Sequence, residues 1–131
     1  MATTTTGFEP VTEAHDHIDV YVRAFNSGDP DLLLALYADD AVSVWEGQAM
    51  TGQPRRDALA EILSAGPKMT ATIRESHITA DAALMIVDWT VETPQPDGTA
   101  ETMSGQAVDV LRRAADGRWR HVIDHPHGAE R

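Results

Sequence analysis

The C-terminal half of the sequence is dominated by long segments of strand-forming residues that short turn sequences separate. Pro96-Asp97-Gly98 and Asp116-Gly117 are turn signals, and each lies between two runs rich in apolar and β-branched residues. Strands joined by such short turns pair antiparallel, since parallel neighbours need a long crossover. We therefore predict four strands of one mostly antiparallel sheet, at Lys68–Thr79, Ala82–Thr93, Ala100–Arg113 and Arg118–Asp124.

Two of these segments, residues 83–87 and 108–111, have apolar residues on both faces of the predicted strand. In an antiparallel sheet, one face usually meets water and is polar. One face of this sheet can pack against helices, but the other then needs a second partner. We expect that partner to be another copy of the chain, which predicts a homodimer formed through the outer face of the sheet.

The sequence ahead of these strands predicts three helices. From Glu9 to Asn26, apolar residues recur every three or four positions, as in one stripe of an amphipathic helix. Asp29-Pro30 predicts the start of a second, short helix, because aspartate caps helices well and proline suits the first helical position. A third helix is expected at about Arg55–Ser64, after a strand over Ala41–Glu46. We predict an α+β fold with a disordered tail at residues 1–8 and a single domain over residues 9–131.

Composition and charge restrict the partners. The 131 residues are 42% hydrophobic and contain no cysteine, which excludes disulfides and thiolate chemistry. The net charge of −11 opposes binding to nucleic acid or to an anionic membrane, and an apolar or neutral small molecule suits it better. The sequence shows neither a signal peptide nor a stretch of about 20 apolar residues, so we expect a cytoplasmic protein.

Asp109 is the most unusual residue of the strand region. It stands between Val108 and Val110, in a segment that is otherwise apolar on both faces. A buried carboxyl group must be hydrogen-bonded, paired with a cation or protonated. It is therefore either a functional group or a structural partner for an arginine or a backbone N–H.

Several aromatic and histidine side chains are further candidates. Tyr21 lies on the apolar stripe of the first helix, and Trp45 and Trp89 are expected to wall an apolar pocket. If the last strand alternates regularly, His121 and His125 share one face with Trp119 and Ile123, and Asp124 lies on the other face. Histidine titrates near neutral pH, so His125 is a candidate acid–base group and His121 a candidate pocket residue. Neither His15 with His17 nor His125 with His127 supplies the three ligands of a catalytic metal, so we expect no metal.

Three segments resemble a known family. They are Tyr37-Ala38-Asp39-Asp40-Ala41, residues 47–52 (GQAMTG) and residues 119–124 (WRHVID). Together with the order of the predicted elements, they resemble the SnoaL-like and ketosteroid-isomerase-like branch of the nuclear transport factor 2-like superfamily, over residues 9–128. The resemblance implies a cone-shaped fold, with three N-terminal helices packed on a strongly curved, mostly antiparallel sheet that encloses a pocket.

The resemblance also implies roles for single residues. Tyr21 falls where ketosteroid isomerases have the tyrosine of their oxyanion hole, and Tyr37 falls on a second, supporting tyrosine. Asp109 lies in a segment similar to the one with the protonated aspartic acid that completes the hole. Trp45 falls where the general-base aspartate would be, and indole cannot accept a proton usefully. We therefore do not expect an authentic ketosteroid isomerase.

These observations favour a small enzyme that needs no cofactor and performs isomerase, cyclase or dehydratase chemistry by proton transfer. Its substrate would be a hydrophobic carbonyl compound, such as a polyketide or a steroid-like ring. Tyr21 and Asp109 would stabilise an enolate oxygen, and His125 would move the proton. Two alternatives remain open: a non-catalytic protein that binds an apolar small molecule, and a dimerisation scaffold.

Overall fold

The computed structural model describes residues 7–130 of the chain. The N-terminal part contains a 3-10 helix (Ala14–Asp16) and three α-helices, α1 (His17–Ser27), α2 (Pro30–Leu34) and α3 (Gly52–Ser64). The strands are β1 (Tyr37–Trp45), β2 (Gln48–Met50), β3 (Lys68–Ile78), β4 (Ala82–Pro94), β5 (Ala100–Arg113) and β6 (Trp119–His125). The α+β class and the three N-terminal helices predicted from the sequence are confirmed.

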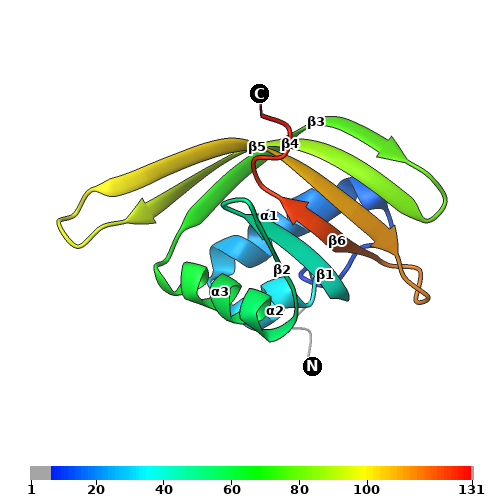
Figure 1. Ribbon diagram of the computed structural model, residues 1–131, viewed down its shortest axis with the longest axis horizontal. Helices are drawn as coiled ribbons and strands as arrows, with labels where there is room; N and C mark the ends of the chain where they lie inside the picture. The colour runs from blue at the N-terminus through cyan, green and yellow to red at the C-terminus, as the bar shows by residue number, and fades with distance from the viewer. Residues whose placement is uncertain (1–6, 131) are drawn as a thin grey trace.

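All six strands form one sheet in the order β2-β1-β6-β5-β4-β3. Every neighbouring pair is antiparallel except β1 and β6, which are parallel. The sheet is strongly curved and arches over the helices, which lie on its concave side (Figure 1). The predicted meander of four strands corresponds to β3–β6, with boundaries within a residue of those expected.

The local signals explain most of the helix boundaries. Asp29 caps α2 as predicted, since its Oδ1 accepts the Asp31 N–H at 2.9 Å. Helix α1 begins at His17, later than the apolar pattern suggested. Residues 10–11 are held against the sheet instead: the Val11 carbonyl accepts the Trp119 N–H at 2.9 Å, and Arg118 donates to the Pro10 carbonyl. The short strand β2 was not predicted, and it pairs with β1 through a turn at Glu46 and Gly47.

Residues 1–6 of the tail predicted at residues 1–8 lie outside the described residues. Phe8 packs against the cluster of buried side chains that α1, α2 and α3 form with the start of β1. The Arg23 guanidinium lies over the Phe8 ring. Within residues 7–130, no helix combines the length and the apolar character needed to cross a bilayer.

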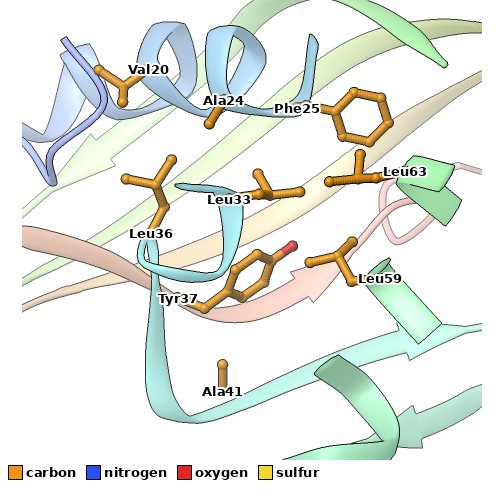
Figure 2. Packing of buried hydrophobic residues seen from close by; sticks show 9 residues of the cluster. All are labelled: Val20, Ala24, Phe25, Leu33, Leu36, Tyr37, Ala41, Leu59 and Leu63. Atoms are coloured by element: carbon orange, nitrogen blue, oxygen red, sulfur yellow. The ribbon is translucent and has the colours of Figure 1, made fainter. Parts of the chain in front are cut away.

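The helices and the sheet are held together by two clusters of buried side chains. In the first, residues of α1, α2 and α3 point toward one another and toward the start of β1 (Figure 2). Its members include Ala24, Leu33 and Leu36, which are fully buried. The second lies between the start of α1 and the inner face of β4–β6, with Met85 and Leu111 at its centre. Burial of such side chains stabilises the fold by about 1.5–3 kcal/mol each.

Strand β6 does not alternate regularly. Val110 pairs with Ile123 but Leu111 pairs with His121, so Val122 is an extra residue in a β-bulge. Directly paired residues share a face. Asp124 pairs with Asp109 on the inner face, and His125 pairs with Val108 on the outer face. The predicted common face of Trp119, His121, Ile123 and His125 is therefore wrong beyond the bulge, where the inward position passes to Asp124.

Candidate functional site

A cavity of about 680 Å³ lies between the helices and the inner face of the sheet. Its walls are mainly apolar and come from α1, α3 and all six strands, with Ile18, Phe25, Leu59, Met69, Val87 and Val91 among them. The inner-face residues of β5 follow it from Glu101 through Met103 and Ala107 to Asp109. The cavity is therefore elongated along β5.

Two carboxyl groups lie side by side at one end of this cavity. Asp109 on β5 and Asp124 on β6 are directly paired, both line the cavity, and they are only 6% and 7% exposed. One oxygen of each and one nitrogen of His121 lie within 4.8 Å of one another. We call Asp109 and Asp124 the carboxyl pair.

A chain of two buried histidines lies behind Asp109. His121 Nε2 is 3.3 Å from Asp109 Oδ1, and His121 Nδ1 is 2.8 Å from His17 Nε2. Burial alone would lower the pKa of His121, but the charges of Asp109 and Asp124 raise it above the ordinary value. Burial, and then the charge of His121, lower the pKa of His17 well below its ordinary value. The geometry thus favours a cationic His121, donating to a neutral His17 and facing the carboxylate of Asp109.

The contact between His121 and Asp109 is an ion pair rather than a hydrogen bond. Although 3.3 Å is within reach, the alignment is poor, and Asp109 Oδ1 has no hydrogen-bond donor among the described residues. A buried carboxylate oxygen without a donor is costly. Asp109 therefore has an unused acceptor position at the edge of the cavity.

Asp124 is held by hydroxyl groups. Tyr37 donates to its Oδ2 at 2.7 Å, Ser43 donates to the same oxygen at 3.4 Å, and the Tyr21 hydroxyl is 2.7 Å from that of Tyr37. Burial, and then the neighbouring charge of Asp109, raise the pKa of Asp124 above its ordinary value. Because Oδ2 is the acceptor, a proton on this carboxyl group belongs on Oδ1.

The tyrosine hydroxyls remain protonated. Burial, and then the charge of Asp124, raise the pKa of both Tyr21 and Tyr37 well above the ordinary value. The hydrogen of Tyr37 points to Asp124, so the hydrogen of Tyr21 points to Tyr37 and its lone pairs remain available. Tyr21 is half-buried, and its side chain lines the cavity.

Arg55 of α3 places a second positive charge near these groups. It is only 2% exposed, and its guanidinium lies 4.5 Å from the centre of the Tyr37 ring, a cation–π contact. Its Nε and Nη1 have no hydrogen-bond partner among the described residues. The charge of Arg55 acts on Tyr21 and His121, where it is the smallest of several influences and lowers the pKa of each group.

Asp109, His121 and Asp124 could in principle offer three ligand atoms to a metal ion. Asp124 Oδ2 already accepts two hydroxyl groups and His121 Nδ1 is engaged by His17, so the ligand atoms would be His121 Nε2 and the other carboxylate oxygens. Arg55 adds a positive charge that acts on His121 and would oppose a cation there.

The structure brings most of the sequence-predicted site residues together. Tyr21, Asp109, Trp45 and Trp89 line the cavity. Tyr37 and His121 are buried directly behind it, in contact with Tyr21, Asp124 and Asp109. His125 is not part of this arrangement, because the bulge in β6 leaves it on the outer face of the sheet.

Three groups of this arrangement were misplaced or overlooked by the sequence analysis. Asp124 was assigned to the wrong face because a bulge has no clear sequence signal. His17 was compared only with its neighbour His15, although its actual partner, His121, is 104 positions away. Arg55 was considered only as the first residue of the third helix, but its side chain is buried against Tyr37.

The fold and site can be compared with known proteins. A comparison with curated proteins gives no match. A putative calcium/calmodulin-dependent protein kinase II association domain from Xanthomonas campestris is 19% identical, with a TM-score of 0.72 over 86% of this chain and 82% of the other. A nuclear transport factor 2-like superfamily protein from Salmonella enterica is 20% identical, with a TM-score of 0.72 over 93% and 90%. These two likenesses show the fold.

A ketosteroid isomerase-like protein from Erwinia carotovora atroseptica is 25% identical, with a TM-score of 0.67 over 85% of this chain and 89% of the other. The profile of the SnoaL-like domain matches residues 18–122, from the first turn of α1 into β6. The match spans most of the chain and includes Tyr21, Tyr37, Asp109 and His121. The chain therefore belongs to the SnoaL-like domain family, within the nuclear transport factor 2-like and ketosteroid isomerase-like superfamily.

Proposed function

We propose that this protein is a small enzyme that transfers protons on a hydrophobic carbonyl compound, such as a polyketide or a steroid-like ring, in an isomerase, cyclase or dehydratase type of reaction. The observation that carries this proposal is the carboxyl pair at the end of an apolar cavity. Two carboxylates this close and this buried resist being ionised together, so the pair favours holding one proton. One member can then accept a proton while the other donates one.

Asp109 is the proposed general base. Its Oδ1 has no hydrogen-bond donor among residues 7–130, and the neighbouring His121 offsets its charge. Asp109 would remove a proton from the carbon next to the carbonyl group. The electrons of that C–H bond form the carbon–carbon double bond of an enolate, and the carbonyl electrons move to oxygen.

Asp124 is the proposed acid. Its Oδ2 accepts from Tyr37 and Ser43, so its proton on Oδ1 can be donated to the developing oxyanion. An enol results. Return of the proton from Asp109 to a different carbon, with the enol proton going back to Asp124, completes an isomerisation with all protons accounted for.

This assignment differs from the roles expected from the sequence. There, Tyr21 and Asp109 stabilised the oxyanion and His125 moved the proton. Here the donor role passes to Asp124, because the hydroxyl hydrogen of Tyr21 is directed to Tyr37. The base role passes from His125 to Asp109. Trp45 lines the cavity without offering a base, so ketosteroid isomerisation is still not expected.

The alternative is a non-catalytic protein that binds an apolar small molecule, which the mainly apolar cavity walls favour. A cyclic ketone would bind in either case, whether the protein is an enzyme or a non-catalytic binding protein. Only the enzyme would remove its protons. The two functions therefore differ in a single measurable step.

That step can be followed with beta-tetralone, an apolar cyclic ketone, dissolved in deuterium oxide. The enzyme should speed exchange of the hydrogens next to the carbonyl group, seen as loss of their proton NMR signal. Asp109→Asn should slow this exchange by roughly 10²–10⁴-fold, the usual contribution of a general base. Glu101→Gln, at an exposed carboxylate that also lines the cavity, is the matched control and should keep the rate. A wild-type rate equal to the buffer rate, with the ketone bound, would instead indicate the binding protein.

A further inference from the structure

The chain beyond β6 continues along β5 and bonds to the backbone of Gln106. The Ala129 N–H donates to the Gln106 carbonyl at 3.1 Å, and the Gln106 N–H donates to Glu130 Oε2 at 3.0 Å. The Trp89 indole N–H donates to the Pro126 carbonyl at 2.7 Å. These contacts fix residues 126–130, which we call the C-terminal strap, against the sheet. Pro126 and His127 of the strap line the cavity.

Gly105 makes room for the strap. It pairs with Trp89 and lies on the inner face of β5, the face that carries Ala107 and Asp109. A Cβ at this position would lie 2.7 Å from Glu130 Oε2 and 2.8 Å from His127 Nδ1. The His127 ring thus occupies the place where a larger residue would point into the cavity.

His127 is held in one orientation. Its Nδ1 lies 2.5 Å from Glu130 Oε2, and its ring meets that of Trp89 edge-on, with 5.4 Å between the centres. The hydrogen bond with His127, and then the Gln106 N–H, lower the pKa of Glu130, so Glu130 is a carboxylate and His127 Nδ1 is the donor. In a neutral imidazole the other nitrogen, Nε2, is then an acceptor. Nδ1 is turned to Gly105 and Glu130, and the side chain, which is 49% exposed, also lines the cavity, so Nε2 is accessible to a ligand.

The carboxyl pair and His127 are separated along one strand. Gly105 and Asp109 are four residues apart on the same face of β5, roughly 13 Å of strand. Ala107, between them, also lines the cavity and is small. A flat apolar molecule can therefore extend along β5 from one polar group to the other.

We propose that His127, fixed by Glu130, forms a second polar subsite of the cavity, and that the substrate is an elongated apolar molecule with an oxygen function at each end. One oxygen lies at the carboxyl pair, and the other donates a hydrogen bond to His127 Nε2. This proposal rests on the proposed function only in assigning the reacting end to the carboxyl pair. The remote contact gives the cavity a preference for length and for a second hydroxyl group.

Two phenols of the same shape provide the test. p-Phenylphenol has one hydroxyl group, and p,p′-biphenol adds a second one at the far end. In isothermal titration calorimetry, wild-type protein should bind the biphenol roughly threefold to tenfold more tightly, the usual net effect of one hydrogen bond. His127→Phe keeps a flat ring beside Trp89 but removes the acceptor, so the preference should disappear. Glu130→Gln, which removes the orienting carboxylate, should reduce it.

His125→Phe is the matched control, because this nearby histidine lies on the outer face of the sheet, and the preference should be retained. The proposal is wrong if wild-type protein and His127→Phe prefer the biphenol equally, or if wild-type protein shows no preference. The calorimetric test of the second subsite is independent of the hydrogen-exchange test of the proposed function. Exchange that depends on Asp109 without a biphenol preference would remove the second subsite alone, whereas the preference without exchange would leave the subsite in a binding protein.

Discussion

Asp124 is the residue whose protonation matters most to this account. Two hydroxyl groups hold one of its oxygens, and Asp109 lies beside it on the next strand. Burial is the main reason that its pKa is raised, and the neighbouring carboxylate adds to it. An acid that keeps its proton when exposed carboxyl groups have lost theirs can serve as a proton donor.

The raised pKa of Asp124 makes stability depend on pH. Above its ordinary value of 3.8, the unfolded chain releases this proton while the folded protein still holds it. The folded state then binds more protons, so this group lowers stability as pH rises toward the folded pKa. Asp124→Asn removes the effect. The free energy of unfolding is measured in urea for wild type and for Asp124→Asn. We expect the wild-type value to fall relative to that of the variant as pH rises over this range. A difference that does not change with pH would contradict the assignment.

The bulge in β6 shows what the sequence could and could not predict at the level of single elements. Period-two patterns and turn signals located β3–β6, because long strands average over local irregularities. One extra residue at Val122 was enough to exchange the faces of Asp124 and His125. The start of α1 was also misplaced, since the carbonyl groups of Pro10 and Val11 bond to distant residues near the start of β6.

The C-terminal strap can pack against β5 because residue 105 is a glycine and has no Cβ. Gly105→Ser should place its Cβ within 3 Å of Glu130, Trp89 and His127, and we expect the strap to detach from β5. The Ala129 N–H would then lose its bond to Gln106, and its hydrogen exchange should become fast. The cost in stability should be about 1–3 kcal/mol.

Thr102→Ala, at an exposed position of the same strand, is the control for this change. It should leave the exchange of the Ala129 N–H unaltered. If Gly105→Ser leaves that amide as protected as in wild type, the strap does not depend on this glycine.

At the scale of the whole molecule, the outer face of the sheet carries a row of apolar side chains. Leu84, Val110 and Ile123 are directly paired across β4, β5 and β6, and Leu84 and Ile123 are 37% and 39% exposed. Val110 lies opposite Asp109 in the alternation, as the sequence predicted. A row of apolar side chains on a sheet face is a candidate interface. We propose that a second copy of the chain covers it, which the apolar patterning of both strands anticipated.

This assembly can be tested through Val110. Light scattering at micromolar concentration should give twice the mass of one chain for wild type. Val110→Asp should give a single chain or an aggregate, because a carboxylate in an apolar interface is costly to desolvate. Asp88→Asn, on the same face but beside Arg74, should keep the dimer. A monomeric wild type would exclude the homodimer.

The central claim is that the end of the cavity holds a proton on Asp124 beside the base Asp109. Carbon-13 NMR of labelled carboxyl groups measures it directly, with Asp124→Asn to identify the signal. We predict that Asp124 keeps the chemical shift of a protonated acid as pH rises past the range in which Asp40, paired with Arg112 and held at a lowered pKa, has ionised. An Asp124 signal that titrates together with that of Asp40 would contradict the account.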